Sequence, residues 1–385
     1  MTICVIGVGF VGEHLIKAFS KFYDVIGIDI SINRIAVLNN SFHLNNNLQS
    51  CKQVAFQSHF NQIENCNMYV VSVPTLLQPD KNIDMTALIS IRDKLLHIAQ
   101  PGSLIMIESS VYVGATRELF KEFLKKGVYV GFSPERVDPG RKLPAIEDIP
   151  KLVSGLNEES LGVCKSFYEK VFKTIVPVSS CECAEMCKLY ENCFRMVNIA
   201  YVNEIADMCD TIGVNVHEMI DASSTKPFGY MPFSPGLGVG GHCIPVNPYY
   251  LFKTGPLPIL QTSTKLMEHR PRLKALQLIE NYNECNNILL IGIGFKKGES
   301  LTTNSPGLSL YKELRLLNKN VTVFDPLVQN TMMHNSIQFC SSLHFTQKNL
   351  QNFDLIIVNV HLNEYEKEVL EMHQNSGGRV HSFVH

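Results

Sequence analysis

The residues with the clearest chemical potential lie in a glycine-rich loop at residues 236–250, GLGVGGHCIPVNPYY. Its first six positions hold four glycines, which let backbone N–H groups approach a ligand closely because glycine has no Cβ. Cys243 lies beside these amides, and a cysteine nucleophile next to N–H donors suits covalent chemistry on a carbonyl carbon. Taken alone, the loop fits a tight turn around an ordinary buried cysteine equally well. The surrounding elements must therefore decide between these interpretations.

A second group of polar side chains lies on one face of a long predicted helix. The pattern of residues 181–212 is helical, and Gly213 is suited to end it. Lys188, Asn192 and Arg195 are four and then three residues apart, which places them on the same face. Such a stripe is more often a solvated surface, but a lysine and an amide that point into a cleft can stabilise an oxyanion. The helix is also long enough to form the centre of a dimer.

Polar residues follow three predicted buried strands at residues 68–73, 104–107 and 128–132. In a parallel sheet, ligands bind beyond the carboxyl ends of the strands, so these residues are candidates for a site. The segments that follow the strands contain Thr75, Ser110, and the adjacent Glu135 and Arg136. The last pair would be a solvated charged turn in isolation, whereas its place after a strand favours a functional role.

The N-terminal residues carry the pattern of a dinucleotide-binding turn. A buried strand at residues 2–6 leads into a turn that opens a helical pattern and consists of Gly7, Val8, Gly9, Phe10, Val11 and Gly12. The N-terminus of that helix offers N–H groups to a pyrophosphate. A second strand ends at Asp29, 17 residues after Gly12, where a carboxylate can accept hydrogen bonds from ribose hydroxyls. We predict NAD rather than NADP, because this acid would repel a 2′-phosphate.

The C-terminal part predicts a second α/β unit. A strand from residue 287 ends in glycines and is followed by a helix from about Leu308 and by strands at residues 321–325 and 353–359. A further helix is predicted before this unit at residues 265–279, and the tail from Gln374 shows no clear element. The predicted fold class is α/β, with two Rossmann-like doubly wound parallel-sheet domains joined by a long central helix and a helical dimerisation region.

The composition favours small molecules or a second copy of the chain as partners. With 34 basic and 36 acidic residues the formal net charge is -2, which gives no reason to expect nucleic acid or membrane binding. We expect a cytoplasmic protein whose 12 cysteines are thiols, because no signal peptide or membrane-spanning run is evident. Cys181, Cys183 and Cys187 could be mistaken for metal ligands, but no matching Cys/His pair follows them, so we predict no metal site.

Seven motifs, in order along nearly the whole chain, resemble those of the UDP-glucose/GDP-mannose 6-dehydrogenase family and particularly its UDP-N-acetylhexosamine branch. They are GVGFVG (7–12), VPT (73–75), ESS (108–110), SPERVDPG (133–140), AEMCKLYEN (184–192), TKPFG (225–229) and GVGGHCIP (238–245). The resemblance implies oxidation of the C6 alcohol of a UDP-N-acetylhexosamine to a carboxylate by two NAD+, with UDP-N-acetylglucosamine favoured over the mannosamine epimer. It further implies that Cys243 forms a thiohemiacetal and then a thioester, which water hydrolyses.

The resemblance also implies roles for individual residues. Lys188 and Asn192 match groups that stabilise an alkoxide, and Glu135 matches a group that helps activate water. Substrate positions are matched by Arg136, Val137, Arg195, Gly240 and Lys296, and cofactor positions by the turn from Gly7 to Gly12, Asp29, Arg34, Thr75 and Ser110. The implied domains are an NAD-binding domain at 1–180, a central helical and dimerisation domain with the cysteine loop at 181–280, and a UDP-sugar-binding domain at 281–385. A homodimer is expected.

Three departures from the family pattern are evident. The family carries Asp four residues after the nucleophile, whereas this chain has Asn247, and an amide can orient a water but cannot take its proton. Leu301 and Thr303 stand where Asp and Arg are usual, so a guanidinium that would bind an anion or hydroxyl is missing. The C-terminal sequence also differs. Two alternatives therefore stand beside the main prediction: a UDP-glucose 6-dehydrogenase, and a sugar-nucleotide-binding homologue with impaired turnover.

Overall fold

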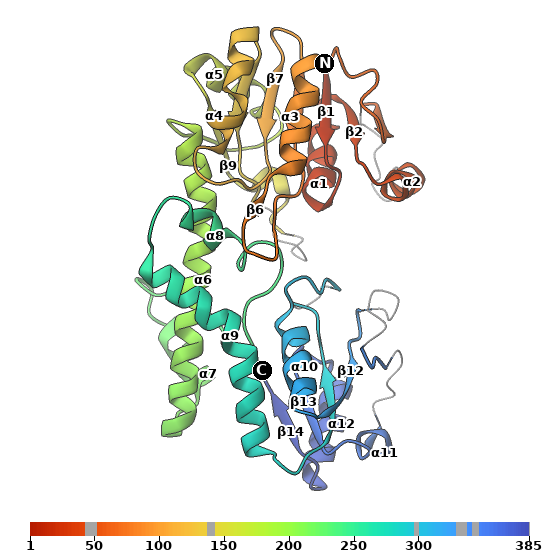
Figure 1. Cartoon of the computed structure of the whole chain (residues 1–385), viewed down its shortest axis with the longest axis vertical. Coiled ribbons are helices and arrows are strands. Elements are labelled where there is room, and N and C mark those ends of the chain that lie inside the picture. The colour runs from red at the N-terminus through yellow and green to blue at the C-terminus, as the bar shows by residue number, and fades with distance from the viewer. Residues whose placement is uncertain (43–51, 137–142, 296–299, 329–336, 341–345, 385) are drawn as a thin grey trace. The chain divides into compact units, whose positions relative to one another are not determined.

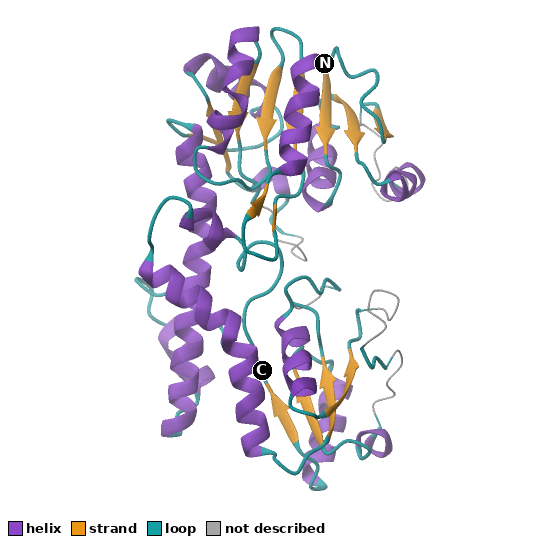
Figure 2. Ribbon diagram, viewed as in Figure 1, coloured by secondary structure: helices purple, strands orange, loops and turns teal. Residues whose placement is uncertain are grey.

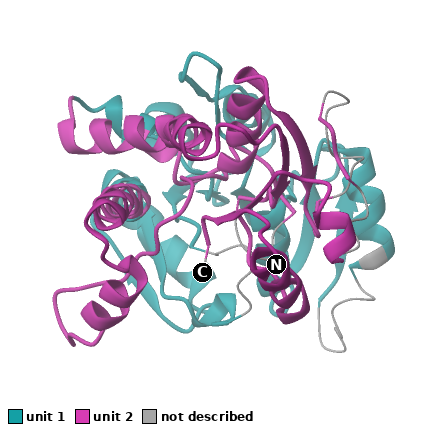
Figure 3. Cartoon of the chain, turned by 90° about the horizontal axis from the view of Figure 1, so that it is seen from below, with its two compact units in different colours: residues 1–191, 249–255 teal, residues 192–248, 256–385 magenta. Residues whose placement is uncertain are grey.

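The computed structural model describes residues 1–42, 52–136, 143–295, 300–328, 337–340 and 346–384. The chain forms two compact units, which Figure 3 colours separately: residues 1–191 with 249–255, and residues 192–248 with 256–385. Within the described ranges, no helix combines the length and the apolar character needed to cross a membrane.

The first unit is built on a large sheet whose strands alternate with helices (Figures 1 and 2). Its elements are β1 (Thr2–Ile6), α1 (Phe10–Phe19), β2 (Asp24–Ile28), α2 (Ile32–Ser41), β3 (Val54–Gln57), β4 (Met68–Val71), β5 (Leu76–Leu77), β6 (Ile83–Asp84), α3 (Thr86–Ile98), β7 (Leu104–Ile107), α4 (Ala115–Phe120), η1 (Lys121–Lys126), β8 (Tyr129–Phe132), η2 (Ile146–Asp148), β9 (Lys151–Gly155), α5 (Glu158–Tyr168) and β10 (Ile175–Pro177). The strand order is β10-β9-β8-β7-β4-β1-β2-β3, and all pairs are parallel except β8 with β9. The order reverses at β1, as in the predicted doubly wound sheet.

Both faces of this sheet are buried. Ile3 and Val5 of β1 lie in a core with side chains of α1, α2 and α5, whereas Cys4 and Ile6 lie in a second core with side chains of α3 and α4. Burial on both faces explains why the strands read as continuous apolar runs rather than as alternating patterns. The candidate residues predicted from the sequence follow the carboxyl ends of β1, β2, β4, β7 and β8.

The central part of the chain is helical, with α6 (Cys181–Ile212), α7 (Val216–Ser224), α8 (Asn247–Phe252) and α9 (Pro258–Asn281). The predicted bounds of α6 are confirmed, and Gly213 has a φ of 70°, which suits the residue that follows a helix. Helix α9 is longer than the predicted 265–279 and begins at Pro258, because proline is well accommodated in the first turn of a helix.

The second unit contains a four-stranded parallel sheet in the order β12-β11-β13-β14. Its elements are β11 (Asn287–Ile291), α10 (Pro306–Leu316), β12 (Asn320–Phe324), α11 (Gln347–Leu350), β13 (Leu355–Val358), α12 (Glu364–Asn375) and β14 (Val380–Ser382). Ile288 and Leu290 of β11 pack with α9 and α10, whereas Leu289 and Ile291 pack with α11 and α12. The predicted second α/β unit is therefore present.

The expectation that the tail has no clear element is wrong. Residues 380–382 form β14, in which Val380 is paired with Ile356 of β13. The preceding helix α12 is stabilised by a capping box, in which Asn363 and Glu366 each accept a hydrogen bond from the other's backbone N–H. A strand of three residues is too short to show a period in the sequence, and its pairing partner supplies the hydrogen bonds that define it.

Candidate active site

The first glycine turn, between β1 and α1, leaves room for a ligand at one position and none at two others. A Cβ on Gly7 would lie 2.4 Å from the Ser72 carbonyl oxygen, and one on Gly12 would lie 2.0 Å from the Gly7 carbonyl oxygen. A Cβ on Gly9 would meet no atom within 4 Å. The outer two glycines therefore permit close packing, and the open middle position, with Val8, Phe10 and Val11 beside it, fits the approach of a pyrophosphate to the backbone.

Asp29 and Arg34 are both tied to this turn. The Asp29 carboxylate accepts hydrogen bonds from the Val8 N–H and the Ser31 N–H, both at 2.9 Å. The Arg34 side chain donates from Nε to the Val8 carbonyl oxygen at 2.9 Å and also pairs with Glu13. The sequence reasoning missed this structural role of Asp29. Each carboxylate oxygen retains a lone pair, so the arrangement still allows Asp29 to accept ribose hydroxyls.

The structure brings Thr75 and Ser110 together at the carboxyl ends of β4 and β7. The Thr75 hydroxyl donates to the Ser110 carbonyl oxygen at 2.6 Å. The hydroxyl of Tyr250, a fully buried residue of α8, donates to the Thr75 carbonyl oxygen, also at 2.6 Å. Tyr250 is the last residue of the 236–250 segment, and the role of its hydroxyl was missed because nothing in the neighbouring sequence indicates a partner for it.

A buried charged group lies under the Glu135 loop. The Lys151 ammonium group contacts the Glu108 carboxylate at 2.6 Å and the Pro134 carbonyl oxygen at 3.3 Å. The Tyr168 hydroxyl donates to the other Glu108 oxygen at 2.6 Å. Burial raises the pKa of the Glu108 carboxyl, although Lys151 opposes the shift. Lys151 was not predicted as a site residue. A lone charge at the start of an apolar strand could have indicated a buried ion pair.

Lys188 and Arg136 lie around the same loop. Lys188 of α6 donates to the Glu135 carbonyl oxygen, so its ammonium group contacts the backbone of the residue predicted to activate water. Glu135 itself is buried. Arg136 pairs with Glu191 of α6 and donates to the Pro150 carbonyl oxygen at 3.3 Å. The structure therefore brings together Glu135, Arg136 and Lys188.

The cysteine loop is joined to α6 through a pair of buried amides. The Asn192 side chain donates to the Asn247 side-chain carbonyl, and both residues are buried. The Asn247 N–H donates to the Cys243 carbonyl oxygen at 2.9 Å in the turn that starts α8. Cys243 is exposed, which contradicts the interpretation of the loop as a turn around a buried cysteine.

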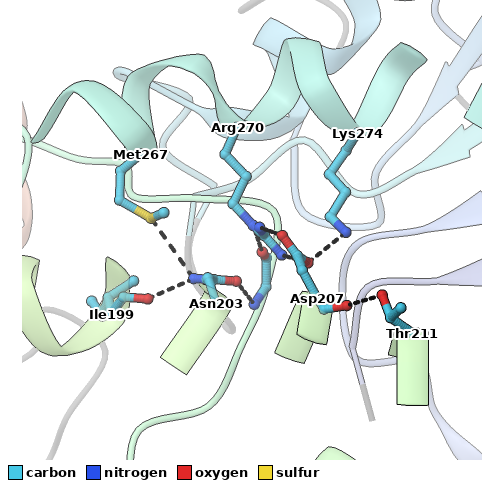
Figure 4. A network of polar contacts seen from close by, with 8 residues as sticks. Ile199, Asn203, Asp207, Thr211, Met267, Arg270 and Lys274 are labelled. Carbon is cyan, nitrogen blue, oxygen red and sulfur yellow. Dashed lines mark hydrogen bonds and ion pairs between the residues drawn. The ribbon is translucent and has the colours of Figure 1, made fainter. Parts of the chain in front are cut away.

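The start of the loop is held by the polar network shown in Figure 4. The Gly236 N–H donates to the Asn203 side-chain oxygen at 2.9 Å, and Arg270 Nε donates to the Gly236 carbonyl oxygen at 2.8 Å. Arg270 also forms two bonds with Asp207, at 2.6 and 3.0 Å, and Lys274 contacts Asp207 at 2.7 Å. The network joins α6 to α9. Gly236 belongs to the loop singled out from the sequence, but none of the side chains that hold it was predicted.

Gly240 and Gly241 pack against Phe295, in the segment that follows β11 of the same compact unit. A Cβ on Gly240 would lie 2.5 Å from Cβ of Phe295, and one on Gly241 would lie 2.8 Å from the Phe295 ring. The Gly241 N–H donates to the Thr303 carbonyl oxygen at 2.8 Å, and the Asn304 side chain donates to the Gly241 carbonyl oxygen at 3.0 Å. The segment that lacks the usual Arg therefore contacts the cysteine loop through other groups.

The remaining predicted residues are less informative. Arg195 is exposed on α6, and Val137 and Lys296 lie outside the described residues. Cys181 is fully buried, and burial raises the pKa of its thiol to about 12, so it is a core residue. Among the described residues, no group of three or more His, Cys, Asp or Glu side chains is arranged to hold a metal.

Comparison with known proteins accounts for almost the whole chain. Residues 1–176 match the NAD binding domain of the UDP-glucose/GDP-mannose dehydrogenase family, residues 182–269 its central domain, and residues 289–380 its UDP binding domain. The UDP-N-acetyl-D-glucosamine 6-dehydrogenase of Pseudomonas aeruginosa is 31% identical over 353 residues, which cover 85% of this chain and 83% of that protein. The UDP-N-acetyl-D-mannosamine dehydrogenase of Methanococcus vannielii is 29% identical, with 94% and 87% covered.

Solved structures agree with this relationship. The UDP-D-ManNAc dehydrogenase of Pyrococcus horikoshii superimposes with a TM-score of 0.86 at 25% identity and covers 100% of this chain and 99% of that one. A UDP-glucose dehydrogenase from Pyrobaculum islandicum gives a TM-score of 0.83 at 17% identity, with 100% and 94% covered, and so shares the fold. The glycine turn with room for a pyrophosphate and the match to all three domains lead to one conclusion: the chain belongs to the UDP-glucose/GDP-mannose dehydrogenase family of NAD-dependent oxidoreductases.

Proposed function

We propose that this chain oxidises the C6 primary alcohol of a UDP-N-acetylhexosamine to the uronic acid, with UDP-N-acetylglucosamine favoured over the mannosamine epimer. The observation that carries the proposal is the exposed Cys243, whose backbone is joined through Asn247 to Asn192 of α6, the helix that also carries Lys188. The proposed substrate class is supported by the relatives, because those at 31% identity are UDP-N-acetyl-D-glucosamine 6-dehydrogenases and others at 28–30% are UDP-N-acetyl-D-mannosamine dehydrogenases.

The first glycine turn, Asp29, Arg34, Thr75 and Ser110 would hold NAD+, which supplies the hydride acceptor for C6. Each of the two oxidation steps consumes one NAD+, so a second NAD+ would replace the first NADH at this site. Lys188 and Asn192 are one helical turn apart on α6 and would stabilise the alkoxide that forms when the C6 hydroxyl loses its proton. Lys188 can also carry that proton away. These two residues would therefore act before any covalent bond to the protein forms.

The Cys243 thiolate would then add to the aldehyde carbon, and the aldehyde oxygen would take a proton to give a thiohemiacetal. Loss of that proton and of the second hydride leaves a thioester on Cys243. Water attacks the thioester carbon, the carbon–sulfur bond breaks, and the thiolate is regenerated as the carboxylate product leaves. Glu135 would help activate this water, and Arg136, Val137, Arg195, Gly240 and Lys296 would contact the substrate.

Asn247 makes thioester hydrolysis the step that we expect to be slow. Its carbonyl oxygen accepts a hydrogen bond from Asn192 and can orient a water, but a neutral amide does not accept a proton at neutral pH. The same observation supports a second candidate function, a sugar-nucleotide-binding homologue with impaired turnover. A UDP-glucose 6-dehydrogenase is the alternative within the same chemistry.

The test is NADH formation with UDP-N-acetylglucosamine, UDP-N-acetylmannosamine and UDP-glucose, with NADH counted per sugar and per enzyme. Repeated turnover at two NADH per sugar with a hexosamine supports the main proposal, and turnover with UDP-glucose alone supports the alternative substrate. A burst of about two NADH per site that then stops indicates a stalled thioester. Absence of NADH with every sugar would contradict the oxidation itself.

A further inference from the structure

Two glycines of the cysteine loop have both of their backbone polar groups bound. Gly236 is held by Asn203 and Arg270, from α6 and α9 (Figure 4). Gly241 is held by the carbonyl oxygen of Thr303 at 2.8 Å and by the side-chain amide of Asn304 at 3.0 Å. Gly241 lies two residues before Cys243, so its two hydrogen bonds directly restrict the backbone position of Cys243.

The segment that holds Gly241 follows β11, where a ligand of the second sheet is expected. Ligands of α/β sheets bind beyond the carboxyl ends of the strands, and residues 289–380 match a UDP binding domain. The turn after β11 repeats the geometry of the first glycine turn: Gly292 has a φ of 92° and donates to the Phe324 carbonyl oxygen at 2.7 Å, whereas Gly7 has a φ of 91° and donates to the Ile28 carbonyl oxygen at 2.8 Å. A nucleotide bound at this turn would therefore lie next to the segment that contacts Gly241.

The connection from this turn to Asn304 is short and hydrogen-bonded. Asp325 accepts from the N–H groups of Ile293 and Gly294 at 2.8 and 2.9 Å. Ser305 donates from its hydroxyl to the Ile293 carbonyl oxygen at 2.5 Å and caps the N-terminus of α10. Asn304 directly precedes Ser305. A displacement of the turn can therefore move Asn304 through the Ser305 side chain alone.

The residue type at position 304 fits this contact. Asn304 has a φ of 50°, in the left-handed region that asparagine tolerates better than most residues. In this conformation the Thr303 carbonyl and the Asn304 amide both reach Gly241. Glycine could adopt the same backbone but has no side-chain donor, and aspartate has the right length but offers an acceptor to the Gly241 carbonyl.

We infer that Asn304 is a positioning residue that couples nucleotide binding at the turn after β11 to the placement of the Cys243 loop. The inference rests on the proposed function, because the ligand is the UDP part of the proposed substrate. A bound nucleotide orders the turn, and the bonds to Gly241 transmit that order to the loop. Removing one such bond should shift the equilibrium between the attached and the detached loop by about two- to tenfold.

The experiment compares the full-length wild type with Asn304→Gly, which keeps the left-handed backbone and removes only the donor. Hydrogen exchange is followed in peptides that cover residues 236–244, with and without UDP, and UDP affinity is measured by calorimetry. We expect UDP to slow exchange of this loop in the wild type, and the effect of UDP to shrink about two- to tenfold in the variant. Because coupling between two sites is reciprocal, UDP affinity should fall by no more than about the same factor. Asn304→Asp should shrink the effect of UDP on exchange further.

The matched control is Asn318→Gly, because Asn318 is a second left-handed asparagine of the same unit, with a φ of 60°, and it lies after α10 rather than on the loop. It should retain the full UDP effect. An undiminished UDP effect in both position-304 variants would overturn the inference and leave the proposed function intact, as would an equal loss in the control. Absence of UDP binding to the wild type would instead contradict the proposed substrate class, and the inference with it.

Discussion

In the proposed mechanism, Asn247 retains the hydrogen bonds that an aspartate could make at this position but not its basicity. Its carbonyl oxygen accepts from Asn192 as a carboxylate oxygen would, and its N–H bonds to the Cys243 carbonyl. The difference between the amide and an acid is the ability to take a proton from water. The substitution should therefore affect deacylation and leave formation of the thioester almost unchanged.

Asn247→Asp is expected to raise steady-state turnover by about a hundredfold, the usual contribution of a general base, without changing the size of the NADH burst. The measurement is stopped-flow NADH formation over the burst and steady-state phases. Asn198→Asp is the control, because Asn198 is an α6 amide whose partner is the Phe194 carbonyl. A variant that stays stalled would show that Asn247 is not the cause of slow hydrolysis.

Cys243→Ser should reduce formation of the uronic acid by more than about a thousandfold, because the weaker nucleophile cannot form the thioester. The product is measured by mass spectrometry. Cys183→Ser is the matched control, since Cys183 is also exposed but lies at the start of α6. Undiminished acid formation by Cys243→Ser would remove Cys243 from the mechanism.

At the scale of the elements, the hydrogen bonds of Figure 4 hold Gly236, at the start of the cysteine loop, against α6 and α9. Burial would raise the pKa of Asp207, but hydrogen bonds from Arg270 and Lys274 outweigh it and lower that pKa below its usual value. A carboxyl whose pKa is lowered by folding stabilises the folded state above its unfolded pKa, and this contribution disappears as pH falls through the folded value. The attachment of α6 to α9 should thus weaken in acid.

Asp207→Asn is expected to lower the free energy of unfolding by about 1 kcal/mol at pH 7, because solvent screens the interactions of a side chain that is 37% exposed. The difference from wild type should stay constant down to about pH 5 and shrink below about pH 4, near the unfolded pKa of aspartate. Urea unfolding followed by circular dichroism at several pH values measures it. Asp221→Asn, which replaces an exposed acid on α7, is the control and should leave the free energy of unfolding at pH 7 almost unchanged. A difference for Asp207→Asn that persists in full at pH 3 would contradict the assignment.

At the scale of the whole molecule, α6 carries an exposed apolar face formed by Tyr201, Met208 and Ile212, which are 64%, 51% and 62% exposed. Their spacing of seven and four residues places them on one side of the helix. Helix α9 exposes Ile259, Leu266 and Leu273 at the same spacing of seven. Apolar side chains in this arrangement favour association, and we propose that a second copy of the chain covers the face of α6.

Replacing Met208 by Glu should convert the proposed dimer into monomer at micromolar concentration, because a charge would be desolvated in the interface. Sedimentation velocity measures the change. Asp210→Asn is the control, since Asp210 is exposed on the opposite side of α6. A wild-type chain that sediments as a monomer would contradict the dimer directly.

The elements that depend on local pattern could be predicted from the amino-acid sequence. The bounds of α6, the glycine turn before α1 and the buried strands with the polar residues that follow them were all readable, because periodicity and glycine requirements act over a few residues. It also brought Cys243, Lys188, Asn192 and Glu135 forward as candidates through their order along the chain. The division into three domains and the roles of the site residues stay predictions.

Which of these groups are in contact depends on how distant parts of the chain pack together. Asn192 meets Asn247 from 55 residues away, and Gly241 meets Asn304 from 63 residues away. Lys151 and Glu108 become a buried pair, and β14 becomes a strand, only because other strands lie beside them. Such contacts arise from the packing of distant elements, whose balance of burial and hydrogen bonding leaves no periodic signal along the chain.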